Sequence, residues 1–265
     1  MSDQKVALVT GGSSGIGLSC AIALQAKGWR VFTLSRREEG PGGFEHIRAD
    51  VSDAAECLRA VEAVLARSPR LDLLVNCAGF GISGAAEFTP EAEAESQVRV
   101  NLFGTANMCK AVIPQMRAQG GGRILNISSF AALTPIPFQI WYSVSKAGIN
   151  SYTMALANEL RPFGISAAAI MPGDTKTGFT DVRRKCPEGD EVYKGTISRS
   201  VAKMEKDERG GMSPDVAGSL VARLAVKKRL APLYTVGFGY QCLALLFKLL
   251  PAALSNRILG MMYAS

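Results

Sequence analysis

Residues 5–17 read KVALVTGGSSGIG. Residues 5–10 form a short, apolar, β-rich run that leads directly into a glycine-rich turn, and a helical pattern follows until Gly28. A strand, a glycine turn and a helix in this order can hold a pyrophosphate between backbone N–H groups and the helix N-terminus. The spacing is G-x-x-x-G-x-G, which differs from the G-x-G-x-x-G of the most familiar dinucleotide fingerprint. The stretch predicts a dinucleotide site, with a plain strand-to-helix connection as the alternative.

Beyond this unit, segments typical of strands and helices alternate along the chain. The alternation predicts an α/β fold of the Rossmann type, a doubly wound parallel sheet with helices on both faces. We find no linker or internal repeat, so we expect a single domain over residues 1–265. The predicted strands are residues 5–10, 30–35, 44–49, 71–76, 122–128, 164–170 and 231–235; the predicted helices are residues 15–27, 53–66, 90–118 with a break near Asn101, 142–160 and 214–226.

Tyr142 and Lys146 stand four residues apart in a segment expected to be helical. This spacing places the phenol and the ammonium on one helix face, one turn apart. A free phenol has a pKa near ~10, and a neighbouring cation moves that pKa toward the range where proton transfer is efficient. Taken alone, however, the same pair usually indicates a solvated helix surface.

Several motifs in a fixed order resemble the short-chain dehydrogenase/reductase family, in the subset with T-G-x-x-x-G-x-G and Y-x-x-x-K. The resemblance covers about Lys5 to about Leu233. One departure is Cys77, which replaces the second Asn of the family's N-N-A-G strand end. The matching segments are the turn at residues 10–17, Asp50-Val51, residues 76–79, Asn101, Ile127-Ser128-Ser129 thirteen residues before Tyr142, and Pro172-Gly173 with Thr175 and Thr177.

The resemblance implies a role for each residue of the catalytic group. Tyr142 would exchange a proton with the substrate oxygen, and Lys146 would lower the Tyr142 pKa and bind the nicotinamide ribose. Ser129 would hold the substrate oxygen, while Ser128 would be a spectator. Asn101 would fix a water molecule that links Lys146 to solvent. The implied catalytic residues are Asn101, Ser129, Tyr142 and Lys146; the implied cofactor-binding residues are Gly11, Ser13, Ser14, Gly15, Ile16, Gly17, Ser35, Arg36, Arg37, Asp50, Val51, Asn76, Ala78, Gly79, Tyr142, Lys146, Pro172, Gly173, Thr175 and Thr177.

The end of the second predicted strand bears on the choice of cofactor. An acidic side chain there would bind the 2′-hydroxyl of NAD, whereas an arginine accommodates the 2′-phosphate of NADP. The chain has Ser35 at this position and Arg36 and Arg37 directly after it. We therefore expect NADP(H) rather than NAD(H), because arginine binds phosphate through charge-assisted hydrogen bonds. The alternative is that both arginines pair with Glu38 and Glu39 at the surface.

Composition excludes several other classes of protein. The six cysteines show no paired spacing, which argues against a disulfide framework and against a zinc site, so no metal is expected. No signal peptide is evident, and we expect a cytoplasmic enzyme. The net charge of +7 suits phosphate-bearing cofactors, nucleic acid or anionic lipid, but no nucleic-acid module is recognisable. The single histidine, His46, lies far from the motifs and is expected to have no catalytic role.

The substrate is the least determined part of the prediction. Residues 174–212 are long, charged in patches and irregular, as an active-site lid would be. The residues flanking Tyr142 are mostly apolar and favour a lipophilic secondary alcohol or ketone, such as a hydroxysteroid or ketosteroid. The alternatives are a 3-oxoacyl thioester, a sugar or a small ketone, or a dinucleotide-binding regulator without turnover. The apolar flanking residues are Leu133, Pro135, Ile136, Pro137, Phe138, Ile140 and Trp141.

An apolar tail occupies about residues 237–265. Leu243, Leu246, Phe247 and Leu250 form one stripe of a predicted helix, which is too short to span a bilayer. A stripe of this kind is expected to be buried against the parent domain, a substrate pocket, another subunit or a membrane surface. We expect a small-molecule lipophilic substrate, a homodimer or homotetramer, and no nucleic-acid partner, with peripheral membrane contact through the tail left open.

Overall fold

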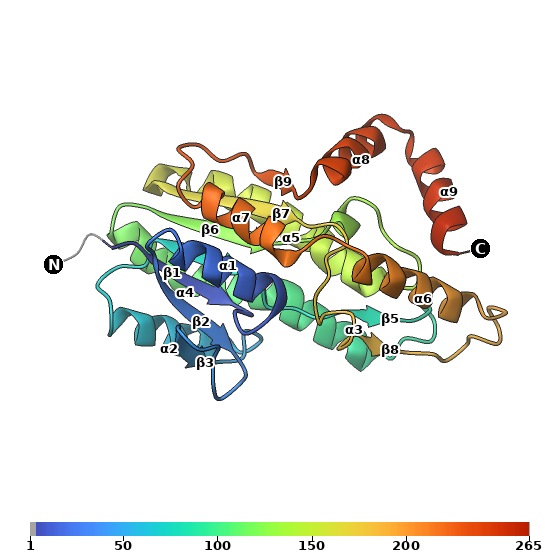
Figure 1. Ribbon diagram of the computed structural model, residues 1–265, viewed down its shortest axis with the longest axis horizontal. Coiled ribbons are helices and arrows are strands. Elements are labelled where there is room, and N and C mark those ends of the chain that lie inside the picture. Colours follow the sequence, from blue (N-terminus) through green and yellow to red (C-terminus); the bar gives the residue numbers. More distant parts are fainter. Residues whose placement is uncertain (1–3, 265) are drawn as a thin grey trace.

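A sheet of seven parallel strands forms the centre of the protein, described here over residues 4–264 from a computed structural model (Figure 1). The spatial order is β3-β2-β1-β4-β6-β7-β9, so the direction of winding reverses between β1 and β4. This confirms the predicted fold class. The strands are β1 (Val6–Thr10), β2 (Arg30–Ser35), β3 (Glu45–Arg48), β4 (Leu73–Asn76), β6 (Gly122–Ile127), β7 (Ile165–Met171) and β9 (Leu233–Thr235), each within two residues of its predicted ends.

Helices cover both faces of the sheet. Side chains alternate along β1, so that Ala7 and Val9 pack beneath α1 (Gly15–Gln25) and α7 (Pro214–Leu224). Val6 and Leu8 point to the opposite face, where they join the core formed with α2 (Ala54–Leu65), α4 (Gly104–Ala118) and α5 (Ile140–Glu159). The strands are apolar on both faces because helices bury both, as expected of a parallel sheet.

The break predicted near Asn101 is a single π-helical turn. Helix α3 (Glu91–Val98) runs into the π-helical segment Arg99–Phe103, and α4 continues from Gly104. Single π turns inside α-helices are frequent at functional sites. Here the turn places Asn101 in the interior, fully buried, with its backbone carbonyl accepting from Thr105 Oγ1 at 2.8 Å.

Two regions differ from the expectation. The predicted irregular stretch 174–212 contains α6 (Thr196–Arg209), and β8 (Arg184–Lys185) within it pairs with β5 (Ile82–Ser83). The helix forms because Ile197, Val201 and Met204 recur at helical spacing and are buried together, a pattern hidden between charged residues. The tail holds the expected helix, α8 (Phe238–Leu249), and an unexpected second one, α9 (Ala252–Tyr263).

Helices α8 and α9 together form what we call the C-terminal arm, residues 238–263. Figure 1 shows the arm (red) standing out from the body at the end of the molecule that also holds α6. Pro251 separates the two helices, and α9 contacts α6 while α8 follows β9. Residues 1–3 and 265 of the range predicted as one domain lie outside the described part of the chain.

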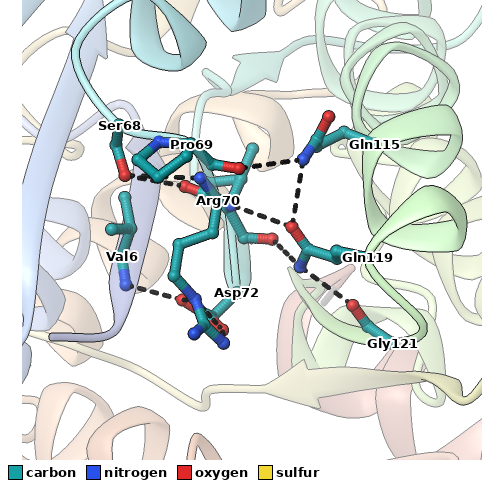
Figure 2. A network of polar contacts seen from close by, with 9 residues as sticks. Val6, Ser68, Pro69, Arg70, Asp72, Gln115, Gln119 and Gly121 are labelled. Atoms are coloured by element: carbon teal, nitrogen blue, oxygen red, sulfur yellow. Dashed lines mark hydrogen bonds and ion pairs between the residues drawn. The ribbon is translucent and has the colours of Figure 1, made fainter. Parts of the chain in front are cut away.

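A polar network holds the opposite, amino-terminal edge of the sheet together (Figure 2). Asp72, just before β4, accepts a hydrogen bond from Val6 N at 2.9 Å and two from Arg70 Nε. Gln119, which follows α4, donates to the carbonyl groups of Leu71 at 2.8 Å and Gly121 at 2.9 Å. These bonds fix β1, β4, α4 and β6 relative to one another, so the carboxyl edge of the sheet is held in register.

Candidate active site

The carboxyl ends of six neighbouring strands, from β3 to β7 in the sheet, open into one cavity of about 1270 Å³. Ligands in open α/β sheets bind at this edge, beside the point where the strand order reverses. Of the residues predicted for the site, only Asn76 and Asn101 do not line the cavity. The predicted residues that line it are Gly11, Ser13, Ser14, Gly15, Ile16, Gly17, Ser35, Arg36, Arg37, Asp50, Val51, Ala78, Gly79, Ser129, Tyr142, Lys146, Pro172, Gly173, Thr175 and Thr177.

The turn between β1 and α1 has the shape of a phosphate cradle. Gly11 and Gly15 have φ of +63° and +52°, which is strained for any residue with a Cβ. A Cβ at Gly17 would lie 2.2 Å from the Gly11 carbonyl oxygen, so glycine is required there as well. Ser14 precedes the helix without capping it by a side-chain hydrogen bond, which leaves the first N–H groups of α1 directed at the cavity. The turn therefore fits a pyrophosphate.

The end of β2 carries the residues expected to select the cofactor. Arg36 and Arg37 are exposed on the cavity, and none of the ion pairs found within residues 4–264 involves them; Glu38 pairs with Arg48 instead. His46 braces this turn, with Nε2 3.1 Å from the Arg37 carbonyl oxygen and 3.4 Å from Ser35 Oγ. The expectation that His46 lies far from the motifs is wrong, because β3 pairs with β2 and brings it beside them.

Asp50, which follows β3, and Thr10, at the end of β1, hold backbone segments beside the cavity by hydrogen bonds. Asp50 lines the cavity, and its Oδ1 accepts hydrogen bonds from Ser52 N and Ser52 Oγ, both at 2.8 Å. Thr10 Oγ1 accepts from the backbone N–H groups of Cys77 and Ala78, both at 3.1 Å. Thr10 thereby ties the end of β4 to the glycine turn, a role that the sequence analysis did not assign.

Tyr142 and Ser129 lie next to each other in the wall of the cavity. Ser129 follows β6, and its hydroxyl, which accepts a hydrogen bond from Ala131 N at 3.1 Å, lies near enough to the Tyr142 hydroxyl to lower the pKa of that phenol. Lys146, one turn further along α5, lies with its Nζ 5.6 Å from the centre of the Tyr142 ring and donates to the Ile127 carbonyl at 3.0 Å. Phe179, from the stretch predicted as a lid, packs against the Tyr142 ring at 5.6 Å between ring centres.

Burial is the largest influence on the pKa values of Tyr142 and Lys146. It raises the pKa of Tyr142 to about 12, although the Ser129 hydroxyl and the charge of Arg183 lower it. Burial also lowers the pKa of Lys146 to about 8. Lys146 is not among the groups that shift the Tyr142 pKa here, and its ammonium is directed at the Ile127 carbonyl; the role of Lys146 in lowering that pKa stays a prediction. The phenol is therefore neutral at physiological pH and can act as a proton donor.

Asn101 and Asn76 lie behind the cavity wall. Asn101 Oδ1 accepts from Phe80 N at 3.0 Å, and its Nδ2 donates to the Phe80 carbonyl at 3.0 Å and to Ser145 Oγ at 3.1 Å. A Cβ at Gly79 would lie 2.9 Å from Asn101 Oδ1 and 3.8 Å from Lys146 Nζ, so both side chains approach that glycine. Asn76 is turned into the core, where its Nδ2 donates to Asn126 Oδ1 at 2.9 Å.

The predicted spectator and the apolar flank have distinct places. Ser128 Oγ donates to the Lys146 carbonyl at 2.9 Å and faces the interior. Of the seven apolar residues flanking Tyr142, only Ile136 lines the main cavity. Leu133 and Pro135 line an adjoining cavity of about 590 Å³, whereas Ile140 and Trp141 are exposed on α5. The apolar residues flanking Tyr142 therefore contribute less to the wall of the main cavity than the sequence predicted.

The C-terminal arm supplies a large apolar part of the cavity wall. The stripe predicted in the tail lines the main cavity, and a second helix, which the sequence analysis missed, contributes as much. The lining residues of the arm are Tyr240, Leu243, Leu246 and Phe247 from α8, Leu250 directly after α8, and Ile258, Leu259, Met262 and Tyr263 from α9. The regular apolar spacing after Pro251 was the available signal for α9.

Tyr240, also missed, joins the arm to the loop after β7. Its hydroxyl donates to Asp174 Oδ2 at 2.6 Å and accepts from Asp174 N at 3.0 Å. The ring fills the space where a Cβ of Gly173 would stand and meets the Phe130 ring at 5.1 Å between centres. The loop at residues 172–177, expected to border the nicotinamide, is therefore held by the arm.

Comparison with known proteins places these features in a family. The family model described as short chain dehydrogenase matches residues 5–187. A 3-ketodihydrosphingosine reductase of Bacteroides thetaiotaomicron is 39% identical over 227 residues, 84% of each chain. A D-threitol dehydrogenase of Mycolicibacterium smegmatis is 35% identical and covers 72% of this chain and 78% of its own. A crystal structure of a short-chain dehydrogenase from Streptomyces avermitilis superposes with a TM-score of 0.82 over 92% of both chains, at 29% identity.

Proposed function

The chain belongs to the short-chain dehydrogenase/reductase family and is an oxidoreductase acting on CH–OH groups with a nicotinamide cofactor, and from this premise we propose that it is an NADP(H)-dependent reductase of a long-chain lipophilic ketone. The observation that carries the proposal is the apolar wall that the C-terminal arm adds to the cavity lined by Tyr142 and Ser129. An apolar wall adds no binding free energy for a small polar substrate, whereas an alkyl chain gains about 0.8 kcal/mol of binding free energy for each methylene that the wall buries.

The proposed chemistry assigns each polar group of the site a task. The cofactor, when bound, supplies the hydride. Tyr142, neutral because it is buried, donates its proton to the carbonyl oxygen, and Ser129 donates a hydrogen bond to the same oxygen as charge develops on it. Lys146 binds the ribose of the cofactor through its ammonium. Asn101 holds the backbone of Phe80 behind Lys146, so we assign it a positioning role in place of direct contact.

Arg36 and Arg37 support NADP(H) over NAD(H). Both lie at the cavity and neither joins the ion pairs of the described chain, while Ser35 takes the place where NAD-binding relatives of this fold carry an acidic residue. An arginine pair left available beside a serine suits a 2′-phosphate, to which it can donate charge-assisted hydrogen bonds. The alternative pairing with Glu38 is weakened because Glu38 contacts Arg48.

The two adjoining cavities favour a long chain over a rigid ring system. Phe247, Leu250 and Leu259 line both cavities, so the apolar space continues from the Tyr142 hydroxyl toward Leu133 and Pro135. A flexible alkyl chain can follow such a path. A relative of this chain is named for a sphingoid ketone, and we therefore place a sphingoid ketone ahead of a ketosteroid among the candidate substrates.

The proposal is tested by NADPH oxidation against ketones that differ only in alkyl chain length, with a ketosteroid and a sugar ketone in parallel. We expect kcat/KM to rise up to about fourfold for each methylene added, because burial of one methylene is worth ~0.8 kcal/mol and a decade is ~1.4 kcal/mol. The rise should stop once the cavity is full. A flat dependence on chain length, or preference for the sugar ketone, would overturn the proposed substrate class.

A further inference from the structure

The outer face of α8 is apolar and exposed. Phe238, Cys242, Leu245 and Leu249 recur at intervals of four, three and four residues, which places them along one side of the helix. Phe238 is 81% exposed, Leu245 is 61% exposed and Leu249 is 75% exposed. The opposite side of the same helix, with Leu243, Phe247 and Leu250, lines the cavity. A helix that is apolar on both sides is normally covered on both sides.

Charge identifies what covers the outer face. The arm, residues 238–263, contains two basic residues and no aspartate or glutamate. Lys248 and Arg257 are exposed on the arm itself. A partner surface that complements such a face is apolar beneath and negatively charged at its rim, as an anionic lipid bilayer is.

We propose that the outer face of the C-terminal arm docks on an anionic membrane surface, with α8 lying in the interface and Lys248 and Arg257 among the headgroups. No helix within residues 4–264 is long and apolar enough to cross a bilayer, which leaves an interfacial position for this arm. The inner faces of α8 and α9 line the cavity, so docking places this wall of the cavity beside the lipid. A lipophilic ligand then enters without crossing water.

Docking is tested on the full chain by cosedimentation with large unilamellar vesicles, without substrate or cofactor. We expect binding to vesicles of phosphatidylcholine with phosphatidylserine, about tenfold weaker binding to phosphatidylcholine alone, and loss of the difference at high salt. Because turnover is not measured, failure of docking and failure of the proposed reductase activity are separate results. No binding of the native chain to either kind of vesicle would overturn the proposal.

Two double variants separate the apolar and the charged contributions. Leu245→Ser/Leu249→Ser should weaken binding to both vesicles at least about tenfold, since these side chains enter the interface. Lys248→Glu/Arg257→Glu should abolish only the preference for phosphatidylserine. The matched control is Ile22→Ser/Leu58→Ser, which removes two exposed apolar side chains from α1 and α2 and should bind as the native chain does. Melting curves confirm folding of each variant.

The competing occupant of the face is a second copy of this chain. If Leu245→Ser/Leu249→Ser lowers the oligomeric mass measured by light scattering and leaves vesicle binding unchanged, the face is a subunit interface and the proposal is wrong. If the mass is unchanged and vesicle binding falls, the membrane is the occupant.

Discussion

Replacing Lys146 with methionine should stabilise the protein while removing its activity. The Lys146 pKa of about 8, against an ordinary value of 10.5, means that burial disfavours the ammonium in the folded state by about 3 kcal/mol. Methionine has a similar shape and no charge to bury. It also loses the hydrogen bond to the Ile127 carbonyl, which offsets about 1 kcal/mol of the gain. We expect a net gain of about 2 kcal/mol at pH 7.

The stability difference between the native protein and Lys146→Met should depend on pH, because Lys146 has different pKa values in the folded and unfolded states. Below pH 8 the lysine is charged in both folded and unfolded states, so the native protein bears the full cost of burial. Between about pH 8 and 10.5 the unfolded state binds more protons, and the free energy of unfolding of the native protein rises relative to that of the variant. The advantage of Lys146→Met should therefore be largest at pH 7 and nearly gone at pH 10.

Thermal unfolding of both proteins at pH 7 and pH 10 measures this difference. A gain of about 2 kcal/mol corresponds to a rise in Tm of roughly 4–8 °C for a chain of this size. The control is Lys110→Met on the exposed side of α4, where no such gain is expected. A variant that is less stable than the native protein at pH 7, or that keeps its reductase activity, would refute the view that the charge is buried for function at a cost in stability.

Two further predictions concern proton transfer and the cofactor. Tyr142→Phe should bind NADPH normally, measured by fluorescence titration, and lose roughly 10²–10⁴-fold in kcat, since only the phenolic proton is removed; near-native kcat would exclude Tyr142 as the acid. Arg36→Ala/Arg37→Ala should raise KM for NADPH by one to two decades per lost contact, at ~1.5–3 kcal/mol each, and spare NADH. Equal losses for both cofactors would show that the arginines do not contact the 2′-phosphate.

The parts of the site predicted from sequence are those that depend on local spacing. The glycines at positions 11 and 15 have positive φ, so their residue type alone indicated the turn. Tyr142 and Lys146 share a helix face because four residues make about one turn. Asn76 was placed in the cofactor site by the resemblance of residues 76–79 to the family's strand end, yet its side chain faces the core, because one residue's shift along a strand reverses the side to which it points.

The sequence by itself determined the alternation of the seven sheet strands with the helices that cover them, the glycine turn and the placing of Tyr142 and Lys146 on one helix face, because hydrogen-bonding periodicity and backbone φ are properties of neighbouring residues. Only the tertiary structure decided the protonation of that pair, since burial raises the Tyr142 pKa and lowers that of Lys146, and burial depends on what distant segments cover. The tertiary structure likewise decided that the tail lines the cavity. An apolar stripe shows that one face of a helix must be covered. Which surface covers that face depends on how distant segments of the chain fold around it.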